Sequence, residues 1–396
     1  MEETKQTDER IILSENKWIP DEKNNKTVLL QNFHNHGIPI VAGEMWFQFW
    51  RIFPIADRVL FFSKRKTDKL DSNLEAIYPF VKSKKIICAH TTPISKLKKV
   101  YYLYKIATSK VIVLDDYCSF LKYVLIKPNQ RVIQVWHASG ALKQFGVDGS
   151  VLPESDEKAS HVQYSLVSVS SNNIRDIYSK AFNISADRIQ PLGVPQTDRF
   201  FQEGKINEAC SAILHKHPEL KGKKIIQYSP TFRDYPDTDR FSFAPPIDFD
   251  RLSITLKPDQ VFVLTPHPVM RETIINKAYP NIIEIRDVKT EDMMLLSERL
   301  ITDYSSVMFE YALLNKPIAF FCPDLNQYDR GFYLKYPEDL PGIVLRTQEE
   351  LESYISDAGS KMNQDSIRQF TEYYMSACDG HSGERIAAMI NQFVNP

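Results

Sequence analysis

Short apolar segments alternate with longer amphipathic segments along most of this 396-residue chain, and this alternation is the feature that most restricts its fold. The apolar segments have the length and the flanking polar residues typical of buried strands, and the segments between them suit helices. The expected strands are Val59–Ser63, Lys85–Ala89, Lys110–Leu114, Arg131–Trp136, Ser165–Ser170, Lys224–Tyr228, Val261–Leu264, Ile282–Ile285, Arg299–Thr302 and Pro317–Phe321. Strands and helices in alternation form parallel sheets that helices cover on both faces, so the sequence predicts an α/β protein.

A chain of this length is expected to form more than one domain. The Gly193-Val194-Pro195 segment ends the first series of strands and helices, and glycine and proline are typical of such boundaries. We therefore predict a doubly wound domain over residues 1–193, a second one over residues 194–375, and a closing helical segment over residues 376–396.

Polar motifs follow four of the predicted strands. They are Trp136-His137-Ala138-Ser139-Gly140, Thr231-Phe232-Arg233-Asp234, Pro266-His267-Pro268 and Asp303-Tyr304-Ser305-Ser306. In doubly wound folds ligands bind at the carboxyl ends of the strands, so we expect the four motifs to face one cleft between the two domains.

The side chains in these motifs suit the transfer of a group carried on a nucleotide diphosphate. Arg233 and His267 are able to neutralise phosphate oxygens, and Ser305 and Ser306 precede an expected helix, where hydroxyls and unpaired backbone N–H groups bind anions. His137, from the other domain, is placed to accept a proton from an attacking hydroxyl. The alternative is structural: a serine pair at this position caps a helix, and a lone histidine at a strand end is satisfied by its neighbours.

Other common sites have no matching pattern in the sequence. We find no GxGxxG dinucleotide fingerprint, no GxxxxGK[ST] P-loop and no GxSxG nucleophile elbow. Asp115-Asp116 and Asp237-Thr238-Asp239 are candidates for holding a divalent cation, but acids in loops are commonly solvated, so we predict no required metal or cofactor. The five widely spaced cysteines contain no CxxC pair, which favours a reducing compartment.

Positive charge is concentrated in one segment, although the whole chain has a net charge of only −1. The segment Lys64–Arg131 has 15 Lys and Arg residues against 5 Asp and Glu. Such a surface suits an anionic partner, and a solvated helix face is the alternative. Just before it, the aromatic stretch Met45–Ile55 is either a membrane-interface segment or part of the core. No run is long and apolar enough for a signal peptide or a membrane span, so any membrane contact is expected to be peripheral.

The ordered combination of motifs resembles the CDP-glycerol glycerophosphotransferase family of teichoic acid synthesis, from about Val59 to the C-terminus. The matching segments are RVIQVWHASGALKQFG (Arg131–Gly146), LGVPQTDRFF (Leu192–Phe201), YSPTFRD (Tyr228–Asp234), TPHP (Thr265–Pro268), ITDYSSVMFEYALLNKPIAFF (Ile301–Phe321) and CDGHSGERIAAMI (Cys378–Ile390). The resemblance implies a GT-B fold with two Rossmann-like domains. The implied reaction moves glycerol phosphate from CDP-glycerol to an acceptor hydroxyl and releases CMP.

The resemblance also implies roles for single residues. His137 matches the family's catalytic histidine, and His267 is the second candidate catalytic residue. Those expected at the donor phosphates are Arg233, Thr231, Asp303, Ser305 and Ser306, with Glu310 at the ribose; those expected on the acceptor side are Trp136, Ser139, Gly140 and Lys143.

Two departures from the family pattern bear on the substrate. Polymerising members commonly read WHGTPLK, whereas this chain has Ala138-Ser139-Gly140-Ala141-Leu142-Lys143, which is more like the primase branch. Thr265 also stands where members often have arginine, so one phosphate-facing charge is either missing or supplied from elsewhere.

A primase would act on an undecaprenyl-diphosphate-linked disaccharide at the cytoplasmic face of the membrane, where the basic and aromatic segments would meet anionic lipid. The alternatives are a glycerol- or ribitol-phosphate polymerase or capsule enzyme of the same family, and a non-catalytic nucleotide- or membrane-binding scaffold. We expect no nucleic-acid partner, because the basic segment contains no recognition module.

Overall fold

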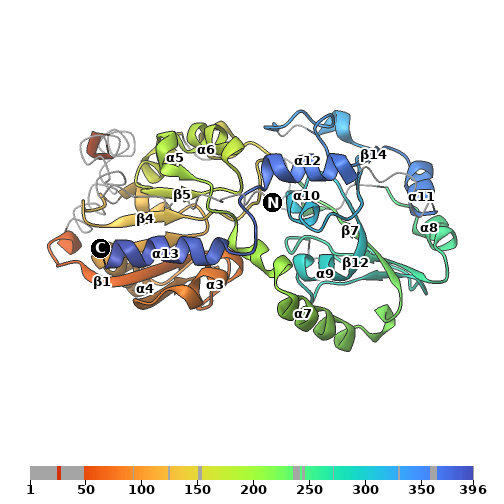
Figure 1. Ribbon diagram of the computed structural model, residues 1–396, viewed down its shortest axis with the longest axis horizontal. Coiled ribbons are helices and arrows are strands. Elements are labelled where there is room, and N and C mark those ends of the chain that lie inside the picture. Colours follow the sequence, from red (N-terminus) through yellow and green to blue (C-terminus); the bar gives the residue numbers. More distant parts are fainter. Residues whose placement is uncertain are drawn as a thin grey trace, which may run out of the picture.

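The computed structural model describes residues 25–27, 49–91, 93–123, 125–149, 154–234, 241–242, 246–270, 272–328, 331–356 and 364–395. Within these residues the fold consists of two six-stranded sheets, both parallel throughout, with helices packed against them (Figure 1). The α/β class and the GT-B-like pair of doubly wound sheets predicted from the sequence are therefore confirmed.

The first sheet has the strand order β2-β1-β3-β4-β5-β6. Its strands are β1 (Ala56–Ser63), β2 (Lys84–Ala89), β3 (Ser109–Leu114), β4 (Arg131–Gln134), β5 (Leu166–Ser168) and β6 (Ile189–Gln190). The helices that follow them are α3 (Ser72–Ile77), α4 (Lys96–Thr108), α5 (Glu154–His161) and α6 (Arg175–Phe182). Alternate residues of β1 enter different apolar clusters: Val59 packs with α3, and Leu60 packs with α4. A strand buried on both faces is apolar at every position, which explains the continuous apolar run in this segment.

The second sheet has the strand order β11-β10-β7-β12-β13-β14. Its strands are β7 (Lys224–Ser229), β10 (Gln260–Leu264), β11 (Ile282–Glu284), β12 (Ser297–Thr302), β13 (Ile318–Phe321) and β14 (Ile343–Leu345). The helices around it are α7 (Glu203–Lys216), α8 (Phe249–Thr255), α9 (Thr290–Leu296), α10 (Val307–Ala312), α11 (Gln348–Ser356) and α12 (Gln364–Tyr374). A small antiparallel pair, β8 (Arg233–Asp234) with β9 (Phe241–Ser242), follows β7. Residues 235–240, which include the candidate cation segment Asp237-Thr238-Asp239, and residues 243–245 lie outside the described residues.

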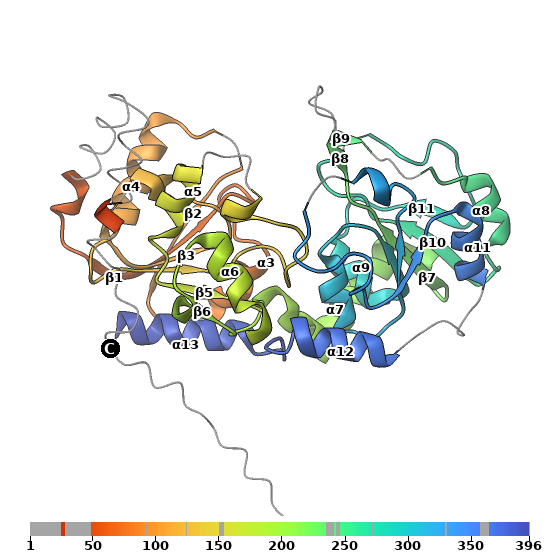
Figure 2. The ribbon, with the colours of Figure 1, turned by 90° about the horizontal axis from the view of Figure 1, so that it is seen from above.

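The last helix, α13 (Ser382–Val394), packs on the first sheet although it ends the chain (Figure 2). Ile386 and Ile390 join the buried cluster that contains Val59. The first turn of the helix is fixed by Asp198, whose carboxylate accepts hydrogen bonds from Ser382 N (3.0 Å) and Gly383 N (2.7 Å). We call the first sheet with α3–α6 and α13 the N-terminal lobe, and the second sheet with α7–α12 the C-terminal lobe.

The predicted strand ending at Trp136 is two residues too long, because β4 ends at Gln134. Trp136 has a φ of +55°, a conformation that no regular strand accepts and that a bulky residue adopts only when its surroundings impose it. The turn after β4 therefore begins two residues earlier than the sequence predicts. This turn contains the first of the polar motifs.

Candidate active site

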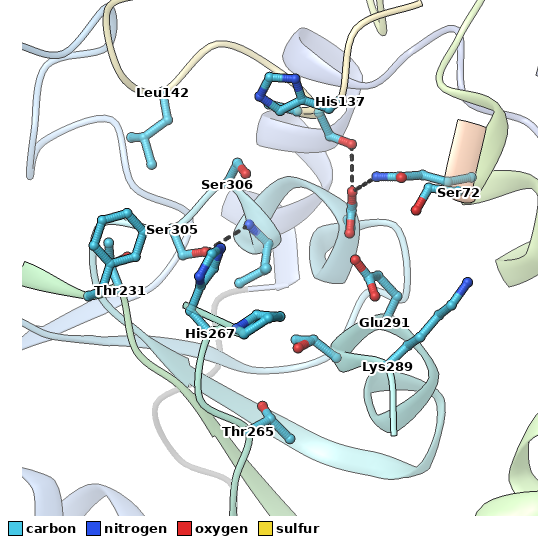
Figure 3. A pocket seen from close by; sticks show the side chains of 18 of the residues that line it. Ser72, His137, Leu142, Thr231, Thr265, His267, Lys289, Glu291, Ser305 and Ser306 are labelled. Atoms are coloured by element: carbon cyan, nitrogen blue, oxygen red, sulfur yellow. Dashed lines mark hydrogen bonds between the residues drawn. The ribbon is translucent and has the colours of Figure 1, made fainter. Parts of the chain in front are cut away.

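A cleft of about 1190 Å³ lies between the carboxyl ends of the two sheets and is lined by both lobes. Ten of the residues predicted for the site line it: Trp136, His137, Ser139, Gly140, Lys143, Thr231, His267, Ser305, Ser306 and Glu310. Figure 3 shows His137 at one wall, with His267, Ser305 and Ser306 on the other side of the cleft. The rule that ligands bind at strand ends thus correctly predicts that these residues, which are distant in the sequence, lie at one cleft.

His137 is held by the strained turn after β4. Asn73 Nδ2 donates to Trp136 O (2.9 Å), and Gln134 Oε1 accepts from Trp136 N (2.9 Å). The His137 ring stacks on the Trp136 indole with centroids 4.5 Å apart. These contacts fix the imidazole at the wall of the cleft.

The charge of His137 is set by burial and by one carboxylate. Its Nδ1 lies 3.6 Å from Asp116 Oδ1, which is itself held by a hydrogen bond from Tyr117 N (2.7 Å). Burial lowers the pKa of His137, and the Asp116 charge opposes this effect. The imidazole is consequently neutral near pH 7 and able to accept a proton, with an acid close by to stabilise the resulting cation.

His267 follows β10 and lies at the wall of the cleft. Val269 N donates to His267 Nδ1 (3.2 Å), so in the neutral ring the proton is on Nε2. Burial lowers its pKa, and the positive charges of Lys143 and Arg65 lower it further. A neutral imidazole with a fixed Nε2–H donor suits a phosphate oxygen.

Ser305 and Ser306 form the turn between β12 and α10, and both are half-buried at the cleft. Ser305 Oγ accepts a hydrogen bond from Val307 N (3.4 Å), whereas the Ser306 side chain makes no capping bond. The two hydroxyls are therefore present at the cleft, whereas the N–H groups of Val307, Met308 and Phe309 already bond to Ser305 and Ser306.

Glu310 and Ser139 join the two lobes across the cleft. Ser139 Oγ donates to Glu310 Oε1 (2.8 Å), and Gln196 Nε2 donates to the same oxygen. Burial, with a smaller effect from the Glu291 charge, raises the pKa of Glu310 to about 8. The expected contacts of Glu310 with ribose and of Ser139 with the acceptor stay predictions, and in this structure the two side chains bind each other.

Arg233 and Asp303 are not among the residues that line the cleft. Arg233 forms ion pairs with Asp303 (3.0 Å) and Asp324 (2.7 Å) and lies over the Tyr304 ring. Asp303 Oδ1 also accepts from Thr231 N (2.8 Å). In this structure the pair fixes the Thr231 loop to the end of β12, and a direct contact of either residue with phosphate stays an untested prediction.

The loop after Gly140 crosses to the C-terminal lobe. Gln144 N donates to Gly331 O (2.9 Å), and Tyr333 N donates to Leu142 O (2.9 Å). Leu142 is buried in an apolar cluster that contains residues of both lobes, among them Phe309. Gly140 itself has a φ of +62° and lies directly against the Phe309 ring, so this crossing point has no room for a side chain.

Several cleft residues were missed in the sequence. Asp71 bridges Lys66 (2.9 Å) in its own lobe and Lys289 (2.8 Å) in the other, and Arg65 also lines the cleft. Arg65, Lys66 and Asp71 follow the end of the predicted strand Val59–Ser63. The rule that ligands bind at strand ends therefore applies to the Arg65–Asp71 segment as well, although this segment contains no motif.

Within the part of the chain that the structure describes, no three His, Cys, Asp or Glu side chains are grouped as a metal site. No helix there is long and apolar enough to cross a membrane. A reaction without a required metal, and peripheral contact with a membrane, stay predictions.

A family model for CDP-Glycerol:Poly(glycerophosphate) glycerophosphotransferase matches residues 56–392. The chain belongs to this family. The family expected from the sequence motifs is thereby confirmed.

Similar glycerophosphotransferase-family proteins include both primases and polymerases. A teichoic acid poly(ribitol-phosphate) polymerase of Bacillus spizizenii is 36% identical over 302 residues, which are 74% of this chain and 48% of the polymerase. A ribitol-phosphate primase of the same organism is also 36% identical, over 74% of this chain and 77% of the primase. A glycerol-phosphate primase of Bacillus subtilis is 31% identical, over 76% and 78% respectively. The chain thus spans about half of the polymerase and more than three quarters of each primase.

Among solved structures, the wall teichoic acid polymerase TagF is similar, with a TM-score of 0.75 and 23% identity over 94% of this chain and 97% of that chain. At this identity the likeness concerns the fold, and it agrees with the two-lobed architecture of Figure 1.

Proposed function

We propose that this protein transfers glycerol phosphate from CDP-glycerol to a hydroxyl of an undecaprenyl-diphosphate-linked disaccharide and releases CMP, the primase step of teichoic acid synthesis. The observation that carries the proposal is the cleft in which His137 of one lobe lies opposite His267, Ser305 and Ser306 of the other. A proton acceptor on one wall and phosphate ligands on the other are what a phosphoryl transfer to a hydroxyl requires.

In the proposed reaction the acceptor oxygen attacks the phosphorus that bears the glycerol. The new P–O bond forms, the bridging P–O bond to CMP breaks, and the hydroxyl proton passes to His137. His267 Nε2–H and the Ser305 and Ser306 groups hold the oxygens of the donor diphosphate while charge develops on the CMP leaving group. CDP-glycerol is a co-substrate that supplies both the cytidine and the polyol. The proposed reaction uses no resident cofactor or metal.

The primase assignment rests on the loop after His137. The Ala138–Lys143 sequence of that loop departs from the pattern expected of polymerising members. CDP-ribitol is a second candidate donor, because the ribitol-phosphate relatives are 36% identical and the glycerol-phosphate primase 31%.

Product analysis by mass spectrometry tests the function. CDP-glycerol and CDP-ribitol are offered together with a lipid-linked disaccharide, with and without EDTA. We expect one or a few glycerol phosphates on each acceptor and the same yield with EDTA. Long chains would instead indicate a polymerase, ribitol products would reassign the donor, and absence of product and CMP would support a non-catalytic scaffold.

The acceptor lipid implies that the enzyme works at the cytoplasmic face of the membrane, and α4 with the segment before β1 is the surface proposed to dock there (Figure 2). Leu97 and Ile52 are 83% and 72% exposed, while Trp50 packs against Tyr104 of α4 (5.4 Å between ring centroids). Exposed lysines share this surface. Apolar side chains beside basic ones favour an anionic lipid surface. The described part of Met45–Ile55 is thus partly packed and partly exposed.

Sedimentation with vesicles tests this docking. We expect the protein to sediment with vesicles that contain phosphatidylglycerol and to stay in solution with phosphatidylcholine alone. A Leu97→Glu variant should bind less, whereas Ile254→Glu, at an 86% exposed site on α8 in the other lobe, should bind as the wild type does. Wild-type protein that stays wholly in the supernatant with anionic vesicles would refute the docking proposal.

A further inference from the structure

We propose that Arg65, from the N-terminal lobe, binds a phosphoryl group of the substrates in the cleft. The inference rests on the proposed phosphotransfer and adds to it a cationic ligand on the same wall as His137. It concerns a residue that belongs to none of the family-like motifs.

The C-terminal lobe lacks a cation at the position expected from related sequences. Thr265 is buried there, and its hydroxyl bonds with Ser229 Oγ (2.7 Å) and Gln227 Nε2 (3.1 Å) inside the lobe. Its side chain therefore belongs to a neutral network rather than to a charged phosphate site.

The other cations of that lobe at the cleft already have partners. Lys289 is paired with Asp71 (2.8 Å) and lies 3.7 Å from Glu75. The Arg286 guanidinium is bound by the Glu284 carboxylate and by the carbonyl oxygens of Met270 and Glu272. Phosphate would have to compete with these partners for both side chains.

Arg65 has a different environment. It follows β1 directly and is exposed in the cleft, and in the described part of the chain no carboxylate lies within ion-pair distance of its guanidinium. Its neighbour Lys66 is the residue that pairs with Asp71 (2.9 Å). The carboxylates of Asp115 and Glu310 interact with the charge of Arg65 only beyond ion-pair distance. Among the described residues the guanidinium thus has no direct ion-pair partner, which suits it to bind a phosphoryl oxygen pair.

The backbone of Arg65 is fixed by the end of the sheet. Arg65 N donates to Ser63 Oγ (3.1 Å), and Ser63 Oγ donates to the buried Asp115 carboxylate (2.8 Å). The chain of contacts anchors the start of the loop to β3, which limits the positions available to the side chain. Such preorganisation reduces the cost of ordering a long side chain on binding.

The positive charge of Arg65 interacts electrostatically with residues on both walls of the cleft. It lowers the pKa of His137 and that of His267, in each case after the larger effect of burial. The guanidinium therefore lies within electrostatic range of both histidines, between which the transferred phosphoryl group is proposed to sit. Two sources of that anion fit: the diphosphate of the donor and a phosphate of the acceptor.

The test compares Arg65→Gln and Arg65→Lys with Lys69→Gln, a control that removes a positive charge from the same loop outside the cleft. Calorimetry measures binding of CDP-glycerol and of inorganic pyrophosphate, and CMP release is measured with a lipid-linked disaccharide and with the same acceptor ending in glycerol phosphate. If the donor is the source, Arg65→Gln should weaken binding of CDP-glycerol and pyrophosphate by about 10- to 100-fold. If the acceptor is the source, donor binding should persist and kcat/KM should fall by a similar factor.

Arg65→Lys should recover part of the loss, because it keeps the charge and loses the planar fork. Arg65→Gln that matches Lys69→Gln and the wild type in every binding and rate measurement would overturn the inference. Failure of the proposed function would look different: wild-type protein would release no CMP, while the pyrophosphate titrations would still report on Arg65.

Discussion

His137→Ala is expected to reduce CMP release by about 10²- to 10⁴-fold, the usual contribution of general acid–base catalysis. Without the imidazole the attacking hydroxyl loses its proposed proton acceptor, and Asp116 is the acid left beside that position. Binding of CDP-glycerol should persist, because the expected diphosphate ligands lie on the opposite lobe. Initial rates with saturating acceptor and calorimetric binding of the donor measure the two effects separately.

His215→Ala is the matched control, since His215 is exposed on α7 and does not line the cleft. A rate near that of the wild type for His137→Ala would exclude the proton-acceptor role. The pH profile adds an independent check. Burial lowers the pKa of His137 from 6.5, and a base must be neutral to act, so the rate should rise with pH along a limb centred below 6.5. A limb well above that value would contradict the assignment.

Gly140→Ala is expected to lower the free energy of unfolding by about 2–5 kcal/mol, from the left-handed backbone and from overpacking together. Gly140 has a φ of +62°, and an added Cβ would lie 2.5 Å from the Phe309 ring. Since that ring belongs to the other lobe, relief of the clash would separate the lobes and displace Ser139 from Glu310. Urea unfolding and CMP release should both be impaired.

Gly204→Ala provides the comparison for this change. Gly204 is in the first turn of α7, and an added Cβ there would meet no atom within 4 Å. Alanine favours the helix over glycine, so stability should be unchanged or slightly higher. If Gly140→Ala were as stable and as active as Gly204→Ala, the tight contact between the lobes would not matter for the folded enzyme.

Local pattern was sufficient to predict most of the fold. Continuous apolar runs such as Val59–Phe62 correspond to strands buried on both faces, and the strand-end rule brought His137, His267 and Ser305 to one cleft. The short strand β14 was not predicted, because only three residues pair with β13 and two of them are partly exposed.

Pairings between distant residues set the limit of the sequence prediction. Arg233 has the residue type of a phosphate ligand, yet its guanidinium forms ion pairs with Asp303 and Asp324. The sequence around Arg233 does not indicate these partners. Glu310 likewise meets Ser139 from 171 positions away. Periodicity and motifs report on one element at a time, whereas ion pairing and hydrogen bonding at a site depend on how elements meet.

The return of the chain through α13 has a mechanical consequence for the lobes. The backbone passes between them twice, once near Val194 and once near Cys378, and the two passages lie side by side: Ala377 N bonds Ser170 O, and Asp198 binds the start of α13. We expect two adjacent backbone segments to resist twisting about the long axis of the molecule more than a single linker would. We therefore expect the cleft to open by a hinge motion about this pair of segments, which would return His137 to its position opposite His267.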